Sequence, residues 1–191
     1  DLGLIFGGIL GDFNGNGTTD FLVIKFEGAS LYEGISDGRF SEKARPVWAA
    51  QPRLKYAQTF TAGDVDGDGD LDLFVAGRVV SGAYPLAPPC SLLMNLGGSF
   101  SDVTEKYCPE LKDIGMVTDA LWSDYDNDGK PDLLITGEWK PVTFFKNDGH
   151  RFTPLKNSGI EKYTGWWNSI AAADFDLDGD IDYVAGNIGV S

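Results

Sequence analysis

The sequence predicts an all-β fold made of repeated four-stranded units, and three observations indicate it. An acidic nine-residue motif recurs four times. Each copy lies between two short apolar runs of strand length, and one or two glycines inside each copy let the chain reverse direction. The motif, Asp-x-Asp/Asn-x-Asp/Asn-Gly-x-x-Asp, occupies residues 12–20, 64–72, 124–132 and 174–182. The flanking runs are too short to make ordinary helices.

Each motif is therefore expected to be the turn of a β-hairpin. The preceding strands are GGILG, AQTFTAG, TDALWS and NSIAAA, and the following strands lie in FLVIKFEG, LFVAGRVV, LLITGEW and YVAGN. Two more strands complete each unit. In the second unit the four strands are expected at 56–63, 71–78, 91–96 and 99–104, with a proline-rich surface insertion at 79–90.

The third unit ends in VTFFKN and HRFTPLK, joined by the hairpin signal Asn147-Asp148-Gly149. The first unit uses SLYEG and RFSEK for the same two strands. The fourth unit stops after its second strand, at YVAGN.

The spacing of the motifs predicts a β-propeller. Their first residues, Asp12, Asp64, Asp124 and Asp174, are 52, 60 and 50 residues apart, which is close to the length of one propeller blade. The chain then forms about three and a half blades, at about 1–50, 51–112, 113–162 and 163–191. An incomplete propeller leaves apolar faces open, so we expect the remainder of the propeller, or another copy of the chain, to cover them.

The alternating oxygen side chains of the motif, followed by glycine and a final carboxylate, suit a hard cation such as calcium. The motifs are not EF-hands, because the twelfth place, where an EF-hand has glutamate, holds Val23, Val75, Ile135 or Ala185. Solvated acidic turns are the alternative, and four copies in register argue against them. A catalytic metal is not favoured, because the motif itself fills most of the coordination sphere.

Composition limits the setting and the partners. The net charge is −14, and about half of the 29 acidic residues lie in the four motifs, so nucleic acid and anionic membrane surfaces are not expected partners. No apolar run is long enough to insert into a membrane. Calcium loops suit the high calcium outside cells, which indicates an extracellular, periplasmic or cell-surface protein. Cys90 and Cys108 either form a disulfide or remain free thiols.

These motifs and their flanking strands resemble FG-GAP or VCBS repeats, the calcium-bearing blades of the integrin α-subunit propeller. The segments GRVVSGAYPLAPPCSLLMN, MVTDALWSDYDNDGKPDLLITGEWKPVTFFKNDG and TGWWNSIAAADFDLDGDIDYVAGNIG resemble the cartilage acidic protein type found in exported bacterial proteins. That type often carries an ASPIC/UnbV module, which this sequence does not show.

The resemblance implies up to four calcium ions, each held by four side chains and one backbone carbonyl. The first set uses two amides, so it should be either the weakest calcium site or empty. In each set the residue that offers its backbone carbonyl to the ion comes last. The four sets are Asp12, Asn14, Asn16, Asp20 and Thr18; Asp64, Asp66, Asp68, Asp72 and Asp70; Asp124, Asp126, Asp128, Asp132 and Lys130; and Asp174, Asp176, Asp178, Asp182 and Asp180.

The sequence favours a non-catalytic module that binds a protein or a glycan at the propeller rim. The single histidine, His150, lies in a turn and has no partner for acid–base chemistry. Trp166 and Trp167 are the best candidates for an exposed ligand contact, whereas Trp122 lies in an expected strand, and Trp48 and Trp139 suit either packing or binding. The alternative is a non-catalytic part of a larger carbohydrate-active enzyme.

Overall fold

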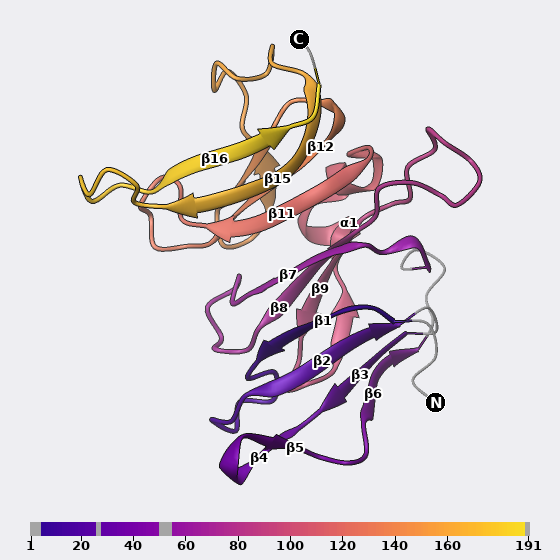
Figure 1. The fold of residues 1–191 in the computed structure, drawn as a ribbon. Coiled ribbons are helices and arrows are strands. Elements are labelled where there is room, and N and C mark those ends of the chain that lie inside the picture. Colours follow the sequence, from indigo (N-terminus) through magenta and orange to yellow (C-terminus); the bar gives the residue numbers. More distant parts are fainter. Residues whose placement is uncertain (1–4, 26–27, 50–54, 190–191) are drawn as a thin grey trace.

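The computed structural model describes residues 5–25, 28–49 and 55–189. Strands are the main element of this part of the chain (Figure 1). They form two four-stranded antiparallel sheets, one six-stranded antiparallel sheet that joins a third four-stranded unit to a final hairpin, and one small two-stranded sheet. The sheets follow one another along the chain as propeller blades do, so the expected fold of about three and a half blades is confirmed. The expected boundary at 50–51 lies outside the described residues.

Blade one contains β1 (Ile5–Gly11), β2 (Asp20–Lys25), β3 (Gly28–Tyr32) and β6 (Arg45–Ala49), in that order across the sheet. The last strand differs from the prediction. RFSEK contributes only β5 (Arg39–Phe40), which pairs with β4 (Gly34–Ile35) around the short 3-10 turn η1 (Ser36–Gly38). Because residues 34–40 form this separate small hairpin, the strand that completes the sheet begins later in the sequence, and its pairing with β3 is bulged between Ala29 and Ser30.

Blades two and three have the expected strands. Blade two contains β7 (Thr59–Gly63), β8 (Asp72–Ala76), β9 (Ser91–Asn95) and β10 (Phe100–Asp102). Blade three contains β11 (Val117–Ser123), β12 (Asp132–Lys140), β13 (Thr143–Asn147) and β14 (Phe152–Pro154). The connection between these blades holds the short helix α1 (Thr104–Tyr107) and the 3-10 turn η3 (Pro109–Asp113), which the sequence analysis did not anticipate.

The final hairpin, β15 (Gly165–Ala173) and β16 (Asp182–Asn187), is joined to blade three by β12. Beyond its pairing with β11, β12 continues and pairs Glu138 with Trp166 and Lys140 with Gly165. The first strands of successive blades are also bonded to one another: the Thr59 hydroxyl donates to the Thr118 carbonyl at 2.8 Å, and the Ile170 amide donates to Asp119 at 3.0 Å. These strands therefore lie side by side along the inner edge of the blades.

The core lies between blades rather than inside them. Leu73 and Val75 of β8 pack with buried residues of blade one, whereas Phe74 and Ala76 pack with buried residues of blade three. Every residue of β8 is therefore buried, because alternate side chains enter different cores. In β16, by contrast, the side chain of Val184 is 57% exposed, and this strand has no neighbour on its outer edge among the described residues.

Tryptophans and cysteines contribute to the same inter-blade packing. Trp48 is buried and lies edge-to-face against Phe100 of blade two, with ring centroids 5.4 Å apart. The ring of Trp122 covers Gly63, where a Cβ atom would lie 2.8 Å from the indole. Both cysteines are free and fully buried, so the structure has the free thiols and not the disulfide. Burial raises the pKa of Cys90 and of Cys108 to about 12, which keeps both protonated at neutral pH.

Within the described residues, no helix has the length and apolar character needed to cross a bilayer.

Candidate metal centres

The four motifs form four loops of one shape at the same end of the blades (Figure 1). We number them in chain order, and the nine places within each from its first aspartate. The fourth and sixth places have positive φ in every loop: Gly15, Gly67, Asn127 and Leu177 at the fourth, and Gly17, Gly69, Gly129 and Gly179 at the sixth. In every loop the first-place aspartate accepts a hydrogen bond from the sixth-place glycine amide, at 2.7–3.1 Å. The glycine is needed because this backbone is costly for other residues.

The ninth-place aspartate joins three segments of each complete blade. In loop two, Asp72 accepts the Val65 amide at 3.0 Å and the Asn95 amide, at the end of β9, at 2.8 Å. Asp20 and Asp132 make the equivalent pair of bonds. All three are buried, with at most 1% exposure. Asp182 accepts only the Phe175 amide among the described residues.

Carboxylates converge in loops two, three and four. In each, the first, third and ninth places offer oxygens that lie within 4.8 Å of one another: Asp64, Asp66 and Asp72; Asp124, Asp126 and Asp132; and Asp174, Asp176 and Asp182. Calcium binds oxygen at about 2.3–2.6 Å, so ligands on opposite sides of the ion are roughly 5 Å apart. The observed separations therefore fit a calcium ion.

The fifth-place side chains lie outside these groups of three. Asp68, Asp128 and Asp178 each accept the amide of the seventh-place residue, at 2.9–3.0 Å. That bond uses one oxygen of each carboxylate. The second oxygen of Asp68 and of Asp178 is left for a cation, whereas the second oxygen of Asp128 contacts the ammonium groups of Lys130 and Lys146. The seventh-place residues of these loops, Asp70, Lys130 and Asp180, are drawn next to the fifth place by the same bond.

Keeping these carboxylates ionised is unfavourable, because they are buried or close to one another, and a bound cation would offset that cost. The pKa of Asp72 is raised to about 7, mainly by burial and also by the neighbouring carboxylates of Asp66 and Asp68, while hydrogen bonds from Asn95 and Val65 oppose the change. The pKa of Asp132 is raised by burial and then by Asp128 and Asp124. At neutral pH a divalent cation would favour the ionised form of both groups.

Loop one differs from the others. Asn14 and Asn16 replace the third- and fifth-place carboxylates, so only Asp12 and Asp20 are acidic. The Asn16 carbonyl oxygen accepts the Thr18 amide at 2.8 Å and lies 2.5 Å from the Thr18 hydroxyl. The fifth place of this loop therefore makes neutral contacts in place of charged ones, and with two fewer charges we expect the loop to bind calcium most weakly.

Loop three has an internal counter-charge. The Lys146 ammonium on β13 pairs with Asp126 and lies 3.1 Å from Asp128. A bound calcium ion would be repelled by this amine, since like charges about 4 Å apart interact with roughly 1 kcal/mol even in water.

Replacing Lys146 with methionine is therefore expected to raise the calcium affinity of loop three about thirtyfold, because the double charge of calcium doubles the repulsion to about 2 kcal/mol. Isothermal titration in a background of Asp64→Ala and Asp174→Ala, which disables loops two and four, measures this affinity. Lys156→Met changes an exposed lysine outside the loops and is the control. Equal affinities for the two lysine variants would contradict the expectation.

Two asparagines, neither of them predicted as a site residue, link loops one and two to the next blade. Asn147 donates its side-chain amide to the carbonyls of Val65 in loop two, at 2.8 Å, and Pro131 in loop three, at 3.1 Å. Its oxygen accepts the Gly149 amide at 2.9 Å. Asn95 makes the same contacts one blade earlier, including a 2.9 Å bond to Phe13 in loop one. The loops are therefore tied together across blade boundaries.

Asn147→Asp is expected to lower the free energy of unfolding by about 3 kcal/mol or more. The substitution turns a donor into an acceptor facing two buried carbonyls, and each unpaired buried group costs about 1–3 kcal/mol. Urea unfolding measures the loss. Asn157→Asp is the matched control because Asn157 is exposed. A loss no greater than that of the control would show that the link contributes little.

The predicted ligand-contact tryptophans lie away from the metal loops. Trp166 and Trp167 are at the opposite end of the β15–β16 hairpin from loop four. Trp166 is 37% exposed, whereas Trp167 is half-buried and donates its indole N–H to the Tyr163 carbonyl at 3.2 Å. Trp139, which the sequence left open, is 63% exposed and contacts Trp166. His150 is exposed in its turn, as expected.

Successive four-stranded units that each have the same acidic loop between their first two strands define a β-propeller repeat protein. A family model described as FG-GAP-like repeat matches residues 12–75 and 124–185, more than half of the chain. The chain belongs to the FG-GAP-like repeat family. A search of curated proteins finds no match.

Among solved structures, the chain resembles an Agrocybe aegerita lectin described as recognising non-reducing terminal N-acetylglucosamine. The TM-score is 0.64 and the sequence identity is 17%. The match covers 94% of this chain and 46% of the lectin, so the chain spans about half the length of that relative. At this identity the likeness shows the fold.

Proposed function

We propose that the chain is a calcium-stabilised, non-catalytic β-propeller module of an extracellular, periplasmic or cell-surface protein, which binds a protein or a glycan at its rim. Converging carboxylates in three loops support calcium binding. Calcium would rigidify the loop end of the blades and leave the opposite end free for a partner. The ligand sets are those given in the sequence analysis, with loop one the weakest.

The observation that carries the binding role is the exposure of two large aromatic rings, Trp139 and Trp166, on this scaffold. Exposed tryptophans are typical of ligand contacts. The fold is also that of a lectin, which makes a glycan a natural candidate. The free edge of β16 and its exposed Val184 would be covered by further blades or by a second copy of the chain.

A second candidate function is a non-catalytic part of a larger carbohydrate-active enzyme. Two assays, on immobilised polysaccharides and on extracellular protein fractions, compare the full-length protein with this chain. Release of sugar by the full-length protein alone supports the second candidate. Specific retention of the chain by either material, without release of sugar, supports the binding module. Release of sugar by the chain itself would overturn the non-catalytic assignment. Failure of both materials to retain the chain would overturn the binding role.

A further inference from the structure

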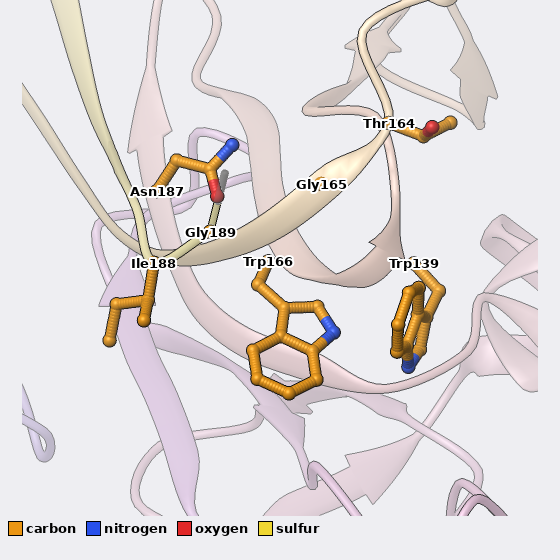
Figure 2. A pocket seen from close by; sticks show the side chains of 7 residues that line it. All are labelled: Trp139, Thr164, Gly165, Trp166, Asn187, Ile188 and Gly189. Carbon is orange, nitrogen blue, oxygen red and sulfur yellow. The ribbon is translucent and has the colours of Figure 1, made fainter. Parts of the chain in front are cut away.

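A pocket of about 470 Å³ lies where the ends of β12, β15 and β16 meet, away from the metal loops (Figure 2). Its walls are formed by Trp139, Trp166, Thr164, Asn187 and Ile188, with two glycines between them. The volume lies in the range of about 300–1,000 Å³ that is usual for small-molecule sites. None of its lining residues is charged.

The two tryptophan rings form the aromatic wall. They meet edge-to-face, with centroids 5.2 Å apart and an interplanar angle of 78°. Figure 2 shows both rings projecting to the same side of their strands. Such a pair uses one face of one ring, so ring surface remains available to a ligand.

The backbone of Trp139 has an unfavourable conformation. Its φ is +60°, in the left-handed region that disfavours side chains of this size, and the pairing of β12 with β15 is bulged between Glu138 and Lys140. Its indole N–H donates to the Tyr84 hydroxyl of the proline-rich insertion at 2.9 Å. A residue that holds a large exposed ring in an unfavourable backbone conformation points to a binding role.

We propose that this pocket binds the terminal residue of an uncharged saccharide, with an aldohexose or N-acetylhexosamine ring stacked on the tryptophans. This inference rests on the proposed binding function and names its site and ligand class. A pyranose has an apolar C–H face that suits indole, and hydroxyl groups at its edge that suit the Asn187 amide and the Thr164 hydroxyl.

Other ligand classes fit the pocket less well. An anionic ligand would meet no basic side chain in the wall and a chain of net charge −14. A purely apolar ligand would make no use of the exposed polar side chains of Asn187 and Thr164 in the wall. A neutral sugar satisfies both the aromatic and the polar parts of the wall.

N-acetylglucosamine and its β1,4-linked dimer are the first probes, followed by glucose, galactose and mannose. Titration calorimetry and tryptophan fluorescence, with the intact chain in calcium, are expected to detect at least one of these sugars with a dissociation constant of about 1 mM, as is usual for a ligand of this size. Trp139→Ala and Trp166→Ala are each expected to weaken binding at least tenfold.

Phe175→Ala is the matched control, because Phe175 is an exposed aromatic residue at the other end of the same hairpin and should leave affinity unchanged. Melting temperatures confirm that each variant is folded. Tyr84→Phe removes the hydroxyl that holds Trp139 and is expected to weaken binding a few-fold.

Three results would overturn the inference. No signal from any neutral sugar would reject the ligand class. Sugar binding that survives both tryptophan substitutions would reject the site while the proposed glycan-binding function stands. Self-association that Trp166→Ala abolishes, without sugar binding, would assign the pocket to a second copy of the chain.

Discussion

Replacing Asp72 with alanine is expected to lower the free energy of unfolding in calcium by about 2–6 kcal/mol, one of the largest effects of any single substitution. Asp72 is buried and accepts two backbone amides, those of Val65 and Asn95. Each amide left unpaired costs about 1–3 kcal/mol. The substitution also removes one proposed ligand from loop two.

The comparison between calcium and chelator separates the two roles of Asp72. Without metal the ionised carboxylate is itself unfavourable, because burial raises its pKa to about 7. The destabilisation should therefore be clearly smaller in chelator than in calcium. Asp180→Ala, which changes an exposed aspartate proposed to use only its backbone carbonyl, is the control. Equal losses for Asp72→Ala in the two conditions would mean that Asp72 does not bind metal.

Chelation of calcium is expected to lower the melting temperature by about 20 °C. A ligand at 100 times its dissociation constant stabilises the folded state by about 2.7 kcal/mol per site, and three acidic loops give about 8 kcal/mol. Each kcal/mol corresponds to roughly 2–4 °C for a chain of this length.

Differential scanning calorimetry in calcium and in excess EGTA measures the shift. Re-addition of calcium should restore the original value, and magnesium should restore less, because magnesium demands a tighter octahedral shell. A shift of less than about 2 °C would show that the loops are stable without metal.

The repeated loops and their hairpins could be predicted because their information is local. Glycine at the sixth place supplies the positive φ, and short apolar runs on either side specify two strands. The spacing of the motif along the chain then predicted the division into blades. The fourth strand of blade one was placed wrongly, because RFSEK follows a turn directly. No local signal shows that Arg39–Phe40 pairs only with the short strand β4 and that Arg45–Ala49 completes the sheet.

The contacts between blades could not be predicted from one sequence. Asn95 and Asn147 each bond to a residue 82 positions earlier, and nothing local distinguishes such an asparagine from an ordinary turn residue. Their one signal is recurrence, since each ends a third strand just before a glycine-containing turn. The role of Trp139, packing or binding, was left open for the same reason, because its exposure depends on a bulge between strands of different blades.

The number of calcium ions bound per chain tests the central claim most directly. Native mass spectrometry of the chain, equilibrated in calcium and then freed of excess ion, is expected to show three retained ions, with a fourth only at higher calcium. Asp64→Ala, Asp124→Ala and Asp174→Ala should each remove one. A chain that retains no calcium, or retains the same number in all three variants, would contradict the assignment of these loops as calcium sites.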